Sequence, residues 1–114
     1  MIKKITTFKL KEGVDPEMVW KLWSGEHAQI IKTFSPLKRY VVNRVIKVIN
    51  GEPSFWGEME VWYESEEAFK KAAHDMDRIK EEIKDNFNDY ISDIVATWVE
   101  EKVILEYESK SNTA

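Results

Sequence analysis

KRYVVNRVIKVINGEPSFWGEMEVWY, residues 38–63, is the stretch that decides the fold. Two segments rich in Val, Ile and aromatic side chains, residues 38–49 and 55–63, flank the pair Asn50-Gly51. Such a pair between two apolar runs is typical of a β-hairpin turn, in which the glycine adopts a positive φ angle. The stretch therefore predicts two antiparallel strands joined by a tight loop.

The length of that loop fixes which residues of the two strands lie opposite each other. Because Pro53 cannot donate a hydrogen bond to a strand ladder, we favour a four-residue loop, residues 50–53, which places Asn43 opposite Glu60. A two-residue loop is the alternative, and it places Asn43 opposite Glu58. Both registers bring the same two strand faces together.

The segments around the hairpin predict two helices and two further strands. Asp15 and Pro16 begin the first helix, because aspartate caps a helix and proline tolerates its first position. Ser65 caps the second helix, whose pattern weakens near residues 75–77. In chain order we expect a strand at 2–10, a helix at 16–34, the hairpin, a helix at 65–87 and a strand at 95–105.

This order, β-α-β-β-α-β, is that of the ferredoxin-like α+β class, with both helices on one side of an antiparallel sheet. We expect one domain over residues 1–107 and a polar tail over residues 108–114. A sheet face that water covers alternates with polar residues, but here both strand faces carry apolar groups such as Val41 and Val61. A second copy of the chain supplies the missing cover, which predicts a homodimer.

Composition excludes several classes of partner. The 114 residues carry a net charge of -4, whereas a nucleic-acid-binding protein needs a basic face. The chain has no cysteine, which suits a reducing cytosol, and the longest run free of charges is six residues, Ile94 to Val99, too short to span a bilayer. We expect a cytoplasmic protein that binds neither nucleic acid nor membranes.

Three stretches resemble the EthD-like members of the dimeric α/β-barrel superfamily. They are Trp23-x-x-Glu26-His27-Ala28, Leu37-Lys38-Arg39-Tyr40-x-x-Asn43, and Gly57-Glu58-Met59-Glu60-Val61-Trp62-Tyr63 with the Ser65-Glu66-Glu67-Ala68 that follows. Their order, with the opening MIKKITTFKLKEGVDPE, resembles that family over residues 1 to 105. The resemblance implies a homodimer in which two sheets close a barrel, with a pocket between the sheet and the helices of each subunit.

Relatives of this fold include polyketide cyclases, muconolactone-isomerase-like enzymes and cofactor-free monooxygenases. The chain departs from them at two places. Cyclase-like relatives carry a histidine where this chain has Lys4, and a second one only loosely matched by His74. Haem-degrading relatives need a strand-one asparagine, where this chain has Thr6 and Thr7.

His27 is the leading candidate for chemistry. It lies on the apolar stripe of the first helix, four residues after Trp23 and three before Ile30. Histidine titrates near neutral pH and can act as a general acid or base there. The alternative is a buried histidine that binds a backbone carbonyl.

The hairpin and the first helix supply the other candidates. Glu60 or Tyr40 would orient His27 or the substrate, and Asn43 would hold Glu60. Indoles desolvate a neighbouring carboxylate, which raises its pKa. The expected substrate-binding residues are Trp20, Trp23, Asn43 and Trp62. In each case the alternative is a core, surface or dimer contact, and for Glu58 and His74 the role stays open.

The sequence therefore predicts a homodimer that binds a small, planar, largely apolar molecule. A cofactor-free proton transfer, such as cyclisation, isomerisation or decarboxylation, is one expected activity. A non-enzymatic ligand-binding or stress-associated protein and a cofactor-free monooxygenase are the alternatives. His27 and His74 lack metal-ligand spacing, and the four glycines form no phosphate-binding loop, so we expect no metal and no cofactor.

Overall fold

A four-stranded antiparallel sheet and three helices make up the computed structural model, which describes residues 1–34, 36–80, 83 and 85–107. The strands lie in the order β2-β3-β1-β4. The elements are β1 (Ile2–Leu10), α1 (Pro16–Leu22), a π-helical turn (Trp23–His27), α2 (Ala28–Phe34), β2 (Arg39–Arg44), β3 (Gly57–Tyr63), α3 (Glu66–Ile79), a 3₁₀ turn (Phe87–Tyr90) and β4 (Ile91–Val99). The expected ferredoxin-like α+β fold is confirmed.

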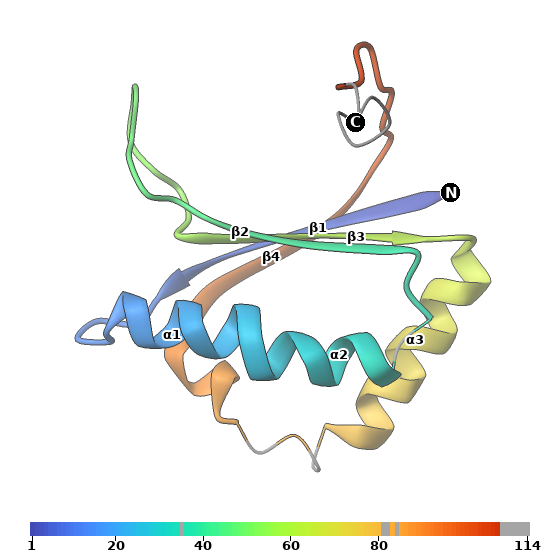
Figure 1. Ribbon diagram of the computed structural model, residues 1–114, viewed down its shortest axis with the longest axis horizontal. Coiled ribbons are helices and arrows are strands. Elements are labelled where there is room, and N and C mark those ends of the chain that lie inside the picture. The colour runs from blue at the N-terminus through green and yellow to red at the C-terminus, as the bar shows by residue number, and fades with distance from the viewer. Residues whose placement is uncertain (35, 81–82, 84, 108–114) are drawn as a thin grey trace, which may run out of the picture.

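All three helices lie on one face of the sheet, and no described element covers the other face (Figure 1). The connection between β2 and β3 and the segment after β4 both stand on that uncovered side (Figure 1). None of the helices in the described part of the chain is long and apolar enough to cross a membrane.

The first helix begins as expected and then departs from regular α-helix. The carboxylate of Asp15 accepts a hydrogen bond of 3.1 Å from the Glu17 amide, with Pro16 at the first helical position. Between Trp23 and His27 the helix widens into a π turn around Gly25. A π turn holds one more residue than an α turn, and such turns are frequent at functional sites. It therefore changes the direction in which His27 points relative to Trp23.

The hairpin has the alternative register. Asn43 lies opposite Glu58, and Val41 lies opposite Glu60; the expected pairing of Asn43 with Glu60 is wrong. The reason is that β2 ends at Arg44, not at residue 49, so the connection is wide and Pro53 makes no demand on the ladder. The Val45 amide donates to the Trp56 carbonyl in the same register, at 2.9 Å.

The second helix and the last strand end earlier than expected. Ser65 caps α3 as expected, and α3 runs through residues 75–77 without a break. It ends at Ile79, and a separate 3₁₀ turn begins at Phe87, preceded by Asn86 with a left-handed φ of 61°. β4 spans Ile91–Val99 and so begins before, and ends before, the expected strand at 95–105.

An aromatic cluster joins β1 to both flanking turns. The Phe8 ring lies edge-on to Trp23 at 4.9 Å and to Phe87 at 5.6 Å, and all three side chains are buried. Gly57 lies opposite Phe8 on β3, where an added Cβ would come within 2.5 Å of the Phe8 ring. A smaller cluster of Val61, Tyr63 and Ala72 lies farther along the sheet.

Gly51 has the expected positive φ, +85°, with no atom within 4 Å of the position of a Cβ. Replacement by a β-branched residue therefore adds backbone strain without a steric clash. We expect Gly51→Val to lower the free energy of unfolding by about 1 kcal/mol or more.

Urea denaturation measures this change, and Gly25→Ala is the matched control. Gly25 is helical and also has open space at its Cβ position, so alanine there should raise stability by about 0.5–1 kcal/mol. Equal stability of Gly51→Val and the wild type would contradict the strained turn.

Candidate functional site

A cavity of about 590 Å³ lies between the helices and the sheet face that they cover. Its volume is within the range of pockets that hold small organic molecules. Aliphatic and aromatic side chains dominate its lining, which includes the rings of Phe8, Tyr63, Phe69 and Phe87. The polar side chains discussed below therefore face a space with a mostly apolar lining, to which Asp77, Lys80, Asn86, Asn88 and Asp89 add further polar groups.

His27 and Asp85 form a close pair in the wall of this cavity. The Nδ1 atom of His27 is 2.6 Å from Oδ2 of Asp85. The two side chains are 13% and 4% exposed, respectively. Because an ionised carboxylate can only accept hydrogen bonds, a neutral His27 carries its proton on Nδ1 and leaves Nε2 as an acceptor.

Two neighbours hold this pair in place. The Phe87 amide donates to Oδ1 of Asp85 at 3.0 Å, which fixes the carboxylate. The His27 ring packs on the Phe87 ring at 4.5 Å. A histidine oriented by a buried carboxylate is an arrangement suited to general acid and base chemistry.

Tyr40 lines the same cavity, as its proposed role requires. Burial raises the pKa of Tyr40 to about 12; the nearby Trp23 opposes this shift and Tyr63 adds to it. Its hydroxyl is buried and has no hydrogen-bond partner among the described residues. At neutral pH the phenol therefore keeps its proton and can donate it to a bound oxygen.

Lys4 and Thr6 add polar groups from β1 to the cavity. Thr6 is 6% exposed, and its hydroxyl is buried without a partner in the described part of the chain. Burial lowers the pKa of Lys4, whose ammonium group lies 5.6 Å from the centre of the Phe69 ring. Sequence reasoning noted these positions as departures from relatives and did not assign them to the site.

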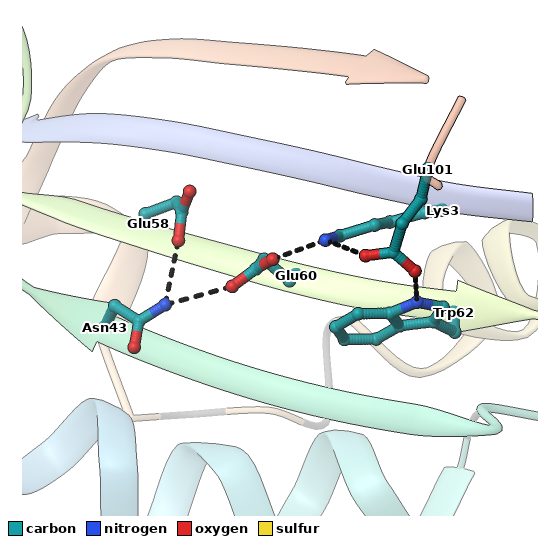
Figure 2. Close-up of polar contacts among 6 residues, drawn as sticks. All are labelled: Lys3, Asn43, Glu58, Glu60, Trp62 and Glu101. Carbon is teal, nitrogen blue, oxygen red and sulfur yellow. Dashed lines mark hydrogen bonds and ion pairs between the residues drawn. The ribbon is translucent and has the colours of Figure 1, made fainter. Parts of the chain in front are cut away.

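The remaining hairpin candidates lie on the opposite, uncovered face of the sheet. Figure 2 shows Glu60 bound to Lys3 at 2.6 Å, and Asn43 donating to both Glu58 and Glu60, at 2.8 and 3.1 Å. Glu60 therefore does not orient His27, and Asn43 does not line the cavity. The expected hydrogen bond between Asn43 and Glu60 is present, but it lies on the uncovered face.

Trp62 also belongs to the uncovered face. Its indole donates to Glu101 at 2.8 Å (Figure 2), and its ring lies between Lys3 and Arg39, each 4.5 Å from the ring centre. Burial opposes the charge on Lys3, but its contacts with Glu101 and Glu60 outweigh that effect and raise the Lys3 pKa. These groups form one charged network on the surface that lacks a cover.

The two helix tryptophans belong to the core and do not line the cavity. Trp23 is fully buried and stacks on Phe87 at 5.9 Å. Trp20 packs edge-on against Trp23 at 5.7 Å, beneath Arg44. The rings of Phe8 and Phe87 line the cavity instead. His74 is exposed on α3.

Asp85 is the member of this cavity pair that the sequence did not reveal. The spacing of Ile83 and Phe87 fitted the apolar stripe of the second helix, so the sequence predicted a helix that continues past Ile79, where it ends in the structure. A usable signal was present in Asp85-Asn86, since both residue types favour caps and turns over helix interiors.

Comparison with solved structures identifies the fold. An EthD family protein of Bacillus halodurans superposes with a TM-score of 0.65 and 16% identity, covering 90% of this chain and 100% of that one. A dimeric ferredoxin-like protein of unknown function from Thermobifida fusca gives 0.60 and 15%, covering 86% and 88%. A variant of MhuD, solved with two manganese protoporphyrin IX molecules bound per active site, gives 0.64 and 20%, covering 96% and 100%.

No protein-family profile matches the sequence, and neither does any curated protein at a significant level. The similarity to the solved structures shows that the chain has the ferredoxin-like fold that EthD-like proteins share, in agreement with the resemblance seen in its sequence. At these identities the likeness defines the fold and leaves the reaction to the side chains of the cavity.

The hydrogen bond between His27 and Asp85 predicts the tautomer of the histidine. Long-range ¹H–¹⁵N spectra of the wild type should show the ring protonated on Nδ1. Asp85→Asn keeps an acceptor for the Phe87 amide but removes the charge, so a larger share of the ring should carry its proton on Nε2, and unfolding should cost about 1 kcal/mol less.

Asp77→Asn, on α3 at another part of the cavity wall, is the matched control and should leave the His27 signals unchanged. A wild-type ring protonated on Nε2 would contradict the geometry described for the pair.

Proposed function

We propose that this chain is an EthD-like protein that binds a small, planar, largely apolar molecule in the cavity. In this proposal His27 acts on the ligand as a general acid and base. The observation that carries the proposal is the His27–Asp85 pair, held at 2.6 Å in the wall of an apolar cavity. A structural histidine needs only a hydrogen bond, whereas His27 makes one through Nδ1 and also lines a space large enough for a ligand.

The proposed reaction is a proton transfer that needs no cofactor. Nε2 of His27 takes a proton from a carbon next to a carbonyl group, and Asp85 stabilises the imidazolium that forms. Tyr40 donates a hydrogen bond to the carbonyl oxygen as it gains negative charge. Return of the proton to another atom of the ligand completes an isomerisation. In a cyclisation the carbanion instead attacks a second carbonyl group, and His27 returns the proton to the alkoxide that forms.

A ligand-binding protein without a reaction is the second candidate. The hydroxyls of Thr6 and Tyr40 support it, since both are buried without a partner among the described residues. A bound ligand with oxygen atoms supplies the hydrogen bonds that they lack. Binding explains this feature without any proton transfer.

Self-association through the uncovered face of the sheet is part of the proposal. Two apolar segments on that side of the molecule (Figure 1) are exposed: Ile46 and Ile49 at 86% and 96%, and Ile104 and Leu105 at 83% and 91%. Exposure of these apolar side chains to water is unfavourable, and a partner surface that covers them lowers the free energy. A second copy of the chain offers both a matching sheet face and these two segments.

The dimer predicts a mass about twice 13.5 kDa in light scattering at micromolar concentration. Replacing both Ile104 and Leu105 by lysine should raise the monomer fraction, since each lysine places a charge in the proposed interface. Met18→Lys, an exposed apolar position on α1, is the control that should stay dimeric. A stable, folded wild-type monomer would overturn the proposal.

The acid–base role predicts that His27 responds to ligands. Addition of 2-naphthol, a planar hydroxylated aromatic, should shift the ring resonances of His27 in NMR spectra. His27→Gln should keep the fold and bind 2-naphthol within about threefold of wild type, since glutamine still forms hydrogen bonds. It should lose any proton exchange at the α-carbon of a bound ketone, such as 2-tetralone in D₂O.

His74→Gln is the matched control, because His74 is exposed on α3, and it should exchange as the wild type does. If 2-naphthol leaves the His27 resonances unchanged in the wild type, the ligand site is lost. If His27→Gln still exchanges the ketone at the wild-type rate, the acid–base role is wrong.

A further inference from the structure

We propose that the cavity takes the carboxylate of an apolar organic acid at Lys4, at the opposite end from His27 and Asp85. This inference rests on the proposed function, since it concerns the ligand of the same cavity. It narrows the ligand class from planar apolar molecules in general to apolar acids.

The sheet register places Lys4 and Tyr40 in one row of side chains. Lys4 on β1 lies opposite Val61 on β3, and Val61 lies opposite Tyr40 on β2. Residues directly opposite one another point to the same face of a sheet, so all three face the helices. With neighbouring strands roughly 4.8 Å apart, the Cα atoms of Lys4 and Tyr40 are roughly 10 Å apart. Thr6 lies two residues along β1 on the same face.

Lys3 and Lys4 show how differently the two faces treat the same side chain. Lys3 points to the uncovered face, where Glu60 and Glu101 each lie 2.6 Å from its ammonium group (Figure 2). Lys4 points into the cavity and forms no ion pair within residues 1–34, 36–80, 83 and 85–107. Its ammonium group lies over the ring of Phe69, which offers only a cation–π contact.

Three described carboxylates line the cavity, and none of them forms an ion pair with Lys4. Asp85 is bound to His27, Asp77 lies 4.0 Å from Lys80, and Asp89 is exposed to solvent. A partly buried ammonium group without a counter-ion is unfavourable, as the lowered pKa of Lys4 also shows. An anionic ligand removes this penalty when it binds, and a neutral ligand does not.

The Thr6 hydroxyl adds a hydrogen-bond donor on the same face of β1 as Lys4. Thr6 Oγ1 is buried without a partner among the described residues. A carboxylate has two oxygens that only accept hydrogen bonds, which suits an ammonium group with a free hydroxyl two residues along the same strand. A cationic or purely hydrocarbon ligand leaves these donors unsatisfied.

The distance between the two ends of the cavity sets the length of the acid. From Lys4 to Phe8 the strand advances four residues, roughly 13 Å at the rise of a β-strand. Phe8 contacts Phe87, and Phe87 contacts His27. The atom that meets His27 is therefore well separated from the carboxylate at Lys4, so the acid group anchors the ligand and does not react.

Calorimetric titration of matched ligands tests this site. The probes are 5-phenylpentanoate and its neutral analogue 5-phenylpentanamide, which have the same apolar body. The wild type should bind the acid at least tenfold more tightly than the amide, as expected for a charge-assisted hydrogen bond in an apolar site. Lys4→Met should bind both with equal affinity, because its side chain has similar length and no charge.

Lys9→Met is the matched control, since Lys9 is exposed on the same strand and its loss changes the net charge equally. It should keep the preference for the acid. NMR supplies a readout that needs no variant. Benzoate should shift the Lys4 side-chain signals alone, and 5-phenylpentanoate should shift those of both Lys4 and His27.

Equal affinity of the wild type for the two probes overturns the carboxylate site, as does a full preference for the acid in Lys4→Met. If the amide still binds and still shifts His27 in either case, the proposed ligand cavity stands. If neither probe binds or shifts His27, both the carboxylate site and the proposed ligand cavity fall.

Discussion

The contact of Phe8 with Trp23 and Phe87 is the interaction on which the rest of the structure depends. It ties β1 to the π turn on one side and to the 3₁₀ turn on the other. His27 ends the first of these turns and Asp85 lies just before the second. The cluster thus brings together two residues that are 58 positions apart in the chain. The rings of Phe8 and Phe87 also form part of the cavity wall between the helices and the sheet.

Alternation along the strands divides the chemistry of the chain between two surfaces. One surface gathers carboxylates, lysine and arginine around Trp62 and faces outward (Figure 2). The other gathers a few polar groups among apolar rings and faces the helices. The sheet separates Lys4 on the cavity face from Glu60 and Glu101 on the uncovered face, so these charges do not neutralise one another. This separation lets the cavity keep an ammonium group whose charge is available to a ligand.

The sequence was sufficient for the fold because three local signals agreed: Asp15 and Ser65 as caps, Gly51 as a turn, and the apolar alternation of the strands. It also placed His27 and Tyr40 on the cavity side. It did not reveal Asp85, because a helical stripe through Phe87 was compatible with the same residues. The face of Glu60 could have been predicted, since Met59 and Val61 on either side of it are apolar and must face the core.

The limits of two strands have a common physical cause. Both Val45 to Ile49 and Val103 to Leu105 have the composition of strands, but in the single chain neither segment forms a strand, and Ile46, Ile49, Ile104 and Leu105 are largely exposed. Strand propensity describes how well a side chain fits a pleated, half-buried surface. Some residues were expected in strands but lie outside them in the structure. These residues lack a pleated, half-buried surface to pack against.

The π turn makes the site separable from the fold. In a regular α-helix the four steps from Trp23 to His27 would turn through about 400°. The wider π turn covers the same four steps with less rotation, and this difference turns His27 toward Asp85 while Trp23 stays in the core. The type of helical turn at this one place therefore sets the direction of the histidine independently of the caps, strands and aromatic cluster.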